Sequence, residues 1–135
     1  MPYADFKETA LVLDNKRLGK QRVEAYQIKR VLAGLTVGWR NHPAVLMWRG
    51  YEDALDEYGR EMCLEWIRRG YTDNMLERFQ HKPRVILPPW LGDSRLHLSH
   101  QSNLIRKYPE HYKPIFPDTP DNLEYYWVVR KENNA

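Results

Sequence analysis

The carboxylate of Glu24 is the side chain whose neighbours best suit it to chemistry. Lys20 and Gln21 precede it by about one helical turn, and Arg17 lies two turns before it on roughly the same side. A carboxylate among cations stays ionised at neutral pH, so it could stabilise positive charge or abstract a proton near a bound phosphate. The alternative is an ordinary Lys20–Glu24 ion pair on a solvated helix, worth a few tenths of a kcal/mol, and the residues alone favour it.

The beginning of the chain offers a possible nucleophile. Met1 precedes a small residue, so we expect the initiator methionine to be removed and Pro2 to present a secondary amine. An α-amino group has a pKa of about 7.7 to 8.0, so a useful fraction is uncharged and nucleophilic at neutral pH. A proline near the start is also common without any chemical role, and an N-terminal extension would leave Pro2 internal and unable to react.

The histidines could indicate a metal site and the single cysteine a thiol nucleophile, but these signals are weaker than those of Glu24 and Pro2. His97 and His100 are three residues apart in an expected helix, so both could face one ion. No third ligand occurs at a diagnostic spacing, which favours hydrogen-bonded histidines on a helix face, and we expect no metal. Cys63 lies in an apolar helical pattern, which predicts a packed thiol. No Gly-rich phosphate loop or nucleophile elbow is present, and no cofactor is expected.

Positive charge is concentrated in one segment. Residues 14–30 contain six Lys or Arg and two Asp or Glu, a net charge of +4, whereas the whole chain has a net charge of +3. A basic stripe along one element is typical of a protein that binds a phosphate backbone. A solvated helix face is the alternative, and composition does not separate the two.

The elements that must position these residues are predicted to be helices. Asp14 can cap a helix that Gly34 ends, and Gly19 inside it suggests close approach of another backbone, with simple tolerance as the alternative. A long second helix should begin at Pro43 and end at Gly70. Its apolar residues recur at spacings of three and four and should form the main core stripe: Ala44, Trp48, Tyr51, Leu55, Tyr58, Met62 and Trp66.

The remaining segments are expected to be short or irregular. We predict a short helix over 73–79, an extended crossing over 81–90 because of its prolines, and a further helix from Asp93 or Ser94 to before Pro109. Residues 1–13 are expected to be an extended arm with at most a short turn. Residues 125–129 form the only strand-like run, and residues 131–135 should be frayed.

These elements predict an all-α fold: a compact single-domain helical bundle, residues 1–135, with a proline- and aromatic-rich C-terminal tail. A chain of 135 residues suits one domain. With one cysteine, no charged-then-apolar leader and no run of 18 apolar residues, we expect neither secretion nor membrane spanning. The expected location is a reducing compartment, the cytoplasm.

Four segments together resemble the pyrimidine-dimer DNA glycosylase/AP lyase family, which includes phage endonuclease V-like enzymes. The resemblance lies in their order and spacing over about residues 11–116, with little identity of residues. The segments are Leu18-Gly19-Lys20-Gln21-Arg22-Val23-Glu24, His42-Pro43, Arg69-Gly70-Tyr71 and Tyr108-Pro109-Glu110-His111-Tyr112-Lys113.

The resemblance implies a small helical protein that flips a nucleotide out of double-stranded DNA and attacks its sugar with the N-terminal amine. Pro2 would supply that amine and Glu24 the essential helical carboxylate. Residues expected to contact DNA are Arg17, Lys20, Gln21, Arg22, Tyr112 and Lys113. The alternatives are a non-catalytic DNA-binding protein on the same scaffold and an interaction or structural protein.

Overall fold

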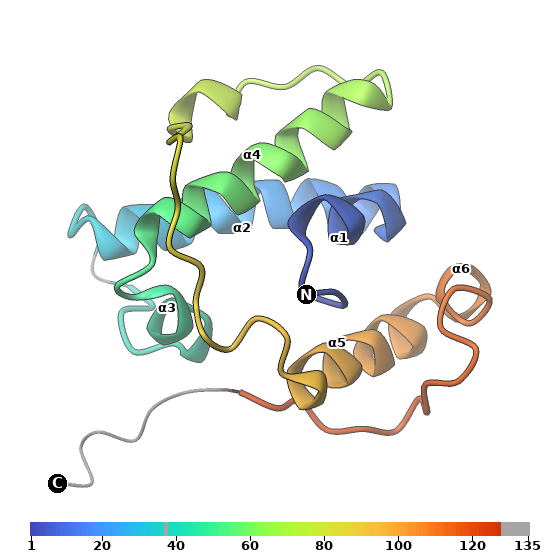
Figure 1. Ribbon diagram of the computed structural model, residues 1–135. Helices are drawn as coiled ribbons and strands as arrows, with labels where there is room; N and C mark the ends of the chain where they lie inside the picture. Colours follow the sequence, from blue (N-terminus) through green and yellow to red (C-terminus); the bar gives the residue numbers. More distant parts are fainter. Residues whose placement is uncertain (37, 128–135) are drawn as a thin grey trace, which may run out of the picture.

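The computed structural model describes residues 1–36 and 38–127, and the regular elements within them are helical (Figure 1). No strand occurs in these two ranges, and the predicted all-α class is confirmed. The elements are α1 (Phe6–Val12), α2 (Asn15–Leu32), α3 (Pro43–Trp48), α4 (Glu52–Arg68), the 3-10 helix η1 (Leu76–Arg78), α5 (Ser94–Lys107) and α6 (Pro109–Tyr112).

Helices α2 and α5 begin where the sequence predicts. Asp14 is the N-cap residue of α2, and Gly34, just beyond its end, has a φ of 78°. Asp93 is the N-cap residue of α5, and its carboxylate accepts a hydrogen bond from the Arg95 N–H at 3.0 Å. A side-chain capping hydrogen bond thus marks the start of α5, whereas the Asp14 side chain makes none, because its carboxylate bonds to Arg17 and Tyr112 instead.

The prediction of an extended arm over residues 1–13 is wrong, because these residues include helix α1. The Asp5 side chain caps it by accepting a hydrogen bond from the Glu8 N–H at 2.8 Å. Thr9 and Ala10 are buried on the side of α1 that faces the protein. A short helix thus forms here because its cap and its buried face act together.

The prediction of one long helix from Pro43 is also wrong, because the chain breaks between α3 and α4. Gly50 lies in the break with a φ of 90°, a conformation that other residues rarely adopt. The helix nevertheless ends as expected, with Arg69 as C-cap and Gly70 at a φ of 94°. The apolar spacing continued through the break, so periodicity alone could not reveal it.

Other parts of the sequence reading need smaller corrections. Gly19 faces the ring of Trp66, which lies 3.1 Å from where a Cβ would stand, so a side chain and not a backbone approaches it. The helix predicted over 73–79 is reduced to η1. Residues 125–127 are not a strand, and residues 128–129 and 131–135 of the predicted strand and frayed end lie outside the described residues.

The core forms mainly where α2 packs against α4. Within the predicted stripe, Trp48, Leu55, Tyr58 and Met62 are buried, while Ala44, Tyr51 and Trp66 are partly buried against them. Cys63 is fully buried, as predicted, and burial raises the pKa of its thiol to about 12. In the described part of the chain, no helix is both long and apolar enough to cross a membrane.

The first residues of the chain lie between the α1–α2 side of the protein and α5 (Figure 1). The segment after α6 runs back along α5 and is bonded to it. The Ser102 hydroxyl accepts a hydrogen bond from the Leu123 N–H at 3.0 Å, and the Ser99 hydroxyl accepts one from the Tyr126 N–H at 3.1 Å. The described part of the C-terminal tail is therefore folded onto α5.

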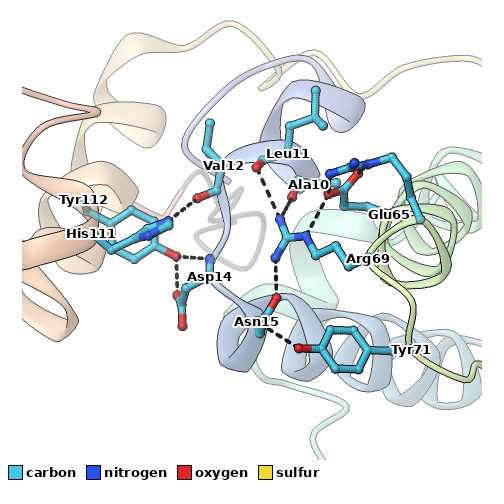
Figure 2. A network of polar contacts seen from close by, with 11 residues as sticks. Ala10, Leu11, Val12, Asp14, Asn15, Glu65, Arg69, Tyr71, His111 and Tyr112 are labelled. Carbon is cyan, nitrogen blue, oxygen red and sulfur yellow. Dashed lines mark hydrogen bonds and ion pairs between the residues drawn. The ribbon is translucent and has the colours of Figure 1, made fainter.

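A polar network fixes the elbow between α1 and α2 (Figure 2). Arg69, at the end of α4, donates to the carbonyls of Ala10 and Leu11 at 3.1 and 3.3 Å and to the Asn15 side chain at 2.9 Å. The same guanidinium donates to Glu65 at 2.7 Å. Arg69 thus satisfies carbonyls at the end of α1 that have no partner within that helix.

From α6, a second set of contacts holds the same elbow (Figure 2). The Tyr112 hydroxyl accepts a hydrogen bond from the Asp14 N–H at 2.8 Å and donates to the Asp14 carboxylate. A ring nitrogen of His111 lies 2.9 Å from the Val12 carbonyl oxygen. The elbow is therefore held from both α4 and α6, which sets the direction in which the preceding N-terminal residues enter the protein.

Replacing Arg69 by methionine should lower the free energy of unfolding by about 2 to 4 kcal/mol, because it removes four hydrogen bonds at a largely buried site. The matched control is Arg68→Met. Arg68 also pairs with Glu65, but its side chain is 64% exposed against 16% for Arg69. Urea denaturation should show a much smaller loss for Arg68→Met. Equal losses of unfolding free energy in the two variants would contradict the role assigned to Arg69 at the elbow.

Candidate active site

A pocket of about 460 Å³ lies between α2 and α5. The first two residues of the chain form part of its wall. Four cations and one carboxylate, Glu24, also line it, the cations being Lys16, Arg17, Lys20 and Lys107. Its aromatic lining comes from four segments and consists of Trp48, Tyr58, Trp90, Tyr125 and Trp127. The pocket thus combines the chain terminus, a carboxylate, positive charge and flat apolar surfaces.

The terminal amine of Met1 is buried in this pocket, in contact with Nδ1 of His100. Burial lowers the pKa of the amine from its usual 8.0 to about 4, and the negative charge of Glu24 opposes this only in part. Desolvation disfavours the charged form of an amine. At neutral pH the amine is therefore uncharged and carries a free electron pair, as a nucleophile must.

Helix α5 holds the backbone of the first two residues. Nδ1 of His97 lies 2.9 Å from the Met1 carbonyl oxygen, and the Gln101 amide donates to the Pro2 carbonyl oxygen at 2.9 Å. Pro2 itself is buried. The two histidines that invited a metal hypothesis thus contact the N-terminal segment, and the described residues contain no group of three or more side chains that could hold a metal ion.

Glu24 lies half-buried in the wall formed by α2. It forms no ion pair with any residue in the described ranges, so the Lys20–Glu24 pair considered from the sequence is not formed. Beside it, the Tyr58 hydroxyl donates to the Gln21 side-chain oxygen at 2.6 Å. Burial, and secondarily the charge of Glu24, raise the pKa of Tyr58, so its hydroxyl remains a proton donor.

Three of the six residues predicted to contact DNA line the pocket: Arg17, Lys20 and Gln21. Lys20 is exposed at the pocket's edge, whereas Arg17 forms an ion pair with Asp14 at 3.2 Å. Lys107, from the last turn of α5, also lines the pocket and was not identified from the sequence. Positive charge is therefore present on two helices that are distant in sequence.

The other three predicted contacts do not reach the pocket. Arg22 forms an ion pair with Asp73 and lies 4.9 Å above the ring of Trp66. Tyr112 is 0% exposed and is bonded to Asp14, while Lys113 is exposed just beyond α6. Arg22 and Tyr112 make contacts within the protein, because both side chains face its interior and not the pocket.

Sequence reasoning missed the contribution of α5 and of the aromatic residues. His97, His100 and Gln101 share one helical face because they are spaced by three and four residues, and this spacing was visible in the sequence. Their partners, however, lie 96 to 99 residues away at the chain terminus. No local pattern indicates that pairing.

Comparison with known families gives a match. The family model described as pyrimidine dimer DNA glycosylase matches residues 1–78, a span that includes Pro2, Glu24 and helices α1 to α4. Helix α5 and the tail lie beyond the matched residues. Comparisons with curated proteins and with solved structures gave no match. Because the matched residues make up more than half of the chain, this protein belongs to the pyrimidine dimer DNA glycosylase family.

Proposed function

We propose that the protein removes damaged pyrimidines from double-stranded DNA and then cleaves the strand at the abasic site, with the amine of Pro2 as nucleophile. The observation that carries this proposal is the burial of the chain terminus in the same pocket as Glu24. Membership of the family supports the substrate class. The reaction needs an uncharged amine, a nearby carboxylate and a surface that attracts phosphates, and the pocket offers each of them.

The proposed reaction begins when the Pro2 nitrogen attacks the C1′ atom of a flipped nucleotide. The bond from C1′ to the base breaks, and the base leaves with the electron pair. The amine proton then passes to O4′ as the C1′–O4′ bond opens, which gives an iminium ion and a free 4′ hydroxyl. Removal of a C2′ proton expels the 3′ phosphate and cleaves the strand, after which water releases the protein from the sugar.

Glu24 is proposed to act in two of these steps. Its negative charge stabilises the cationic sugar while the base leaves, and its oxygen then accepts the C2′ proton. A carboxylate that is not neutralised by an ion pair is suited to both tasks. The low pKa of the buried terminal amine supports the same arrangement, because it leaves an uncharged amine in the pocket that Glu24 lines.

The surroundings of the pocket suit a nucleotide rotated out of a duplex. A flipped base is held by stacking on aromatic side chains, and the pocket wall contains five of them. Cations at its edge would contact the phosphates on either side, with Lys20 on α2 and Lys107 on α5. Lys113 remains a proposed peripheral contact. Arg22 and Tyr112 are not among the proposed DNA contacts, because both side chains bond within the protein.

Removal of Met1 is part of this proposal. With Met1 in place, the residue occupies space in the pocket beside Glu24 and its amine contacts His100. Removal would free the Pro2 nitrogen from its peptide bond and enlarge the space in front of Glu24, while Gln101 still holds the Pro2 carbonyl. We expect the same burial to keep the pKa of the Pro2 amine below its ordinary value.

Borohydride should trap a covalent adduct between an abasic duplex and the processed protein, because it reduces the iminium ion to a stable amine. Mass spectrometry should first show Pro2 as the terminal residue and then locate the adduct there. Trapping should persist at pH 6, below the pKa of about 8 of an ordinary terminal amine, if burial lowers the pKa of the Pro2 amine as it lowers that of Met1. A chain that keeps an extension before Met1 is the control. No adduct from processed protein would refute the nucleophile assignment.

Glu24→Gln should slow strand cleavage at an abasic site by about 100-fold or more, because the amide can neither accept the C2′ proton nor stabilise a cation. Duplex binding should be retained. Glu77→Gln changes an exposed acid outside the pocket and should leave the cleavage rate unchanged. Cleavage that survives Glu24→Gln would contradict the proposed role. Binding without cleavage by the unsubstituted protein would instead favour the non-catalytic alternative.

Lys20→Gln and Lys107→Gln should each weaken duplex binding and lower the slope of log affinity against log salt concentration by about one. Each change removes one cation from the pocket's edge. Lys7→Gln is the matched control, since Lys7 is exposed on α1 and does not line the pocket. The measurement is a series of duplex binding titrations between low and moderate salt. Equal slopes for all three variants would exclude Lys20 and Lys107 as phosphate contacts.

A further inference from the structure

Three polar side chains on one face of α5 contact the first two residues of the chain. His100 contacts the Met1 amine, His97 the Met1 carbonyl, and Gln101 the Pro2 carbonyl. All three residues lie beyond the span matched by the family model. A helix formed late in the sequence thus holds the terminus on which the proposed chemistry depends. We call His97, His100 and Gln101 the α5 clamp.

The other contacts of Gln101 and His97 determine which way each side chain donates. The Thr119 hydroxyl donates to the Gln101 oxygen at 2.6 Å, which leaves the amide nitrogen to donate to Pro2 at 2.9 Å. The Gly92 N–H donates to Nε2 of His97 at 2.9 Å, so Nδ1 carries the hydrogen that faces the Met1 carbonyl. Gln101 and His97 are therefore oriented before any substrate binds.

The contact made by Gln101 does not depend on Met1. Its acceptor is the carbonyl of Pro2, a group that remains when the first residue is removed. The bond from His97, by contrast, would be lost with Met1 and would leave a free N–H donor near the new terminus. Gln101 is thus the member of the clamp that holds the proposed nucleophilic residue itself.

Chain termini fray unless other groups hold them. A frayed amine would meet a flipped nucleotide only in a fraction of its conformations, whereas a fixed amine gains the full rate advantage of orientation. We infer that Gln101, oriented by Thr119, is a positioning residue that directs the Pro2 amine toward the space in front of Glu24. This inference rests on the proposed function.

Gln101→Leu in the processed protein tests the inference. Single-turnover cleavage of a saturating abasic duplex should slow by about 10- to 100-fold, because the amine is no longer held in position. The dissociation constant for the duplex should change by less than about twofold, since Gln101 is not among the pocket-lining residues. Gln80→Leu is the matched control, because Gln80 is exposed in the crossing segment.

A second readout needs neither DNA nor activity. Reductive methylation of the terminal amine by formaldehyde and cyanoborohydride, followed by mass spectrometry, measures how accessible the amine is. Gln101→Leu should be methylated several times faster than the unsubstituted protein, while Gln80→Leu should match it. Thr119→Val should also accelerate methylation, but by less, because it removes only the hydroxyl that orients the Gln101 amide.

The two readouts separate the clamp from the proposed function. Unchanged methylation and cleavage in both Gln101→Leu and Thr119→Val would overturn the inference. Thr119→Val also serves if Gln101→Leu fails to fold. If the unsubstituted protein cleaves no abasic DNA but Gln101→Leu still accelerates methylation, the clamp holds the terminus and the proposed chemistry is what fails.

Discussion

The burial of the chain's first residues between α2 and α5 is the constraint on which the arrangement of this protein depends. A charged terminal amine is costly to remove from water, and here the cost appears as a pKa lowered to about 4. Two features of the fold make this burial possible. The elbow held by Arg69 and Tyr112 directs the chain inward, and the α5 clamp supplies partners for its carbonyls. The same contacts leave an uncharged amine beside Glu24.

Helix α2 divides its positive charge between two uses. Arg22 and Lys29 form ion pairs with Asp73 and Asp56, which tie α2 to the α4 side of the core. Lys20, on the pocket side, is exposed instead. The net charge of the segment could not distinguish these groups, because both kinds of cation contribute equally to it. Which face each residue occupies decides whether its charge stabilises the fold or is available to phosphate.

The sequence predicted the parts that local signals determine. Asp14, Asp93 and Gly70 stand at helix ends as predicted, and for Asp93 and Gly70 the reason is local: a capping hydrogen bond to the Arg95 N–H and a positive φ just beyond α4. Helix α1 was missed because it is short and depends on burial against the rest of the protein, and the break at Gly50 was hidden by continuous apolar spacing. Glu24 was identified because its neighbours share its helix. The clamp was not, because its partners come from opposite ends of the chain.

The residues matched by the family model and those beyond them contribute different parts of the pocket. The proposed nucleophile and Glu24 both lie within residues 1–78, and so does the α2 edge with Lys20. The opposite wall, with His100, Lys107, Tyr125 and Trp127, comes from α5 and the tail. A wall that contributes no group to bond breaking can change its shape and charge without altering the reacting atoms. Its task in the proposed reaction is to keep the chain terminus in place. In the proposed reaction the two parts of the chain therefore have separate tasks: residues 1–78 contain the reacting groups, and α5 holds the backbone of Pro2.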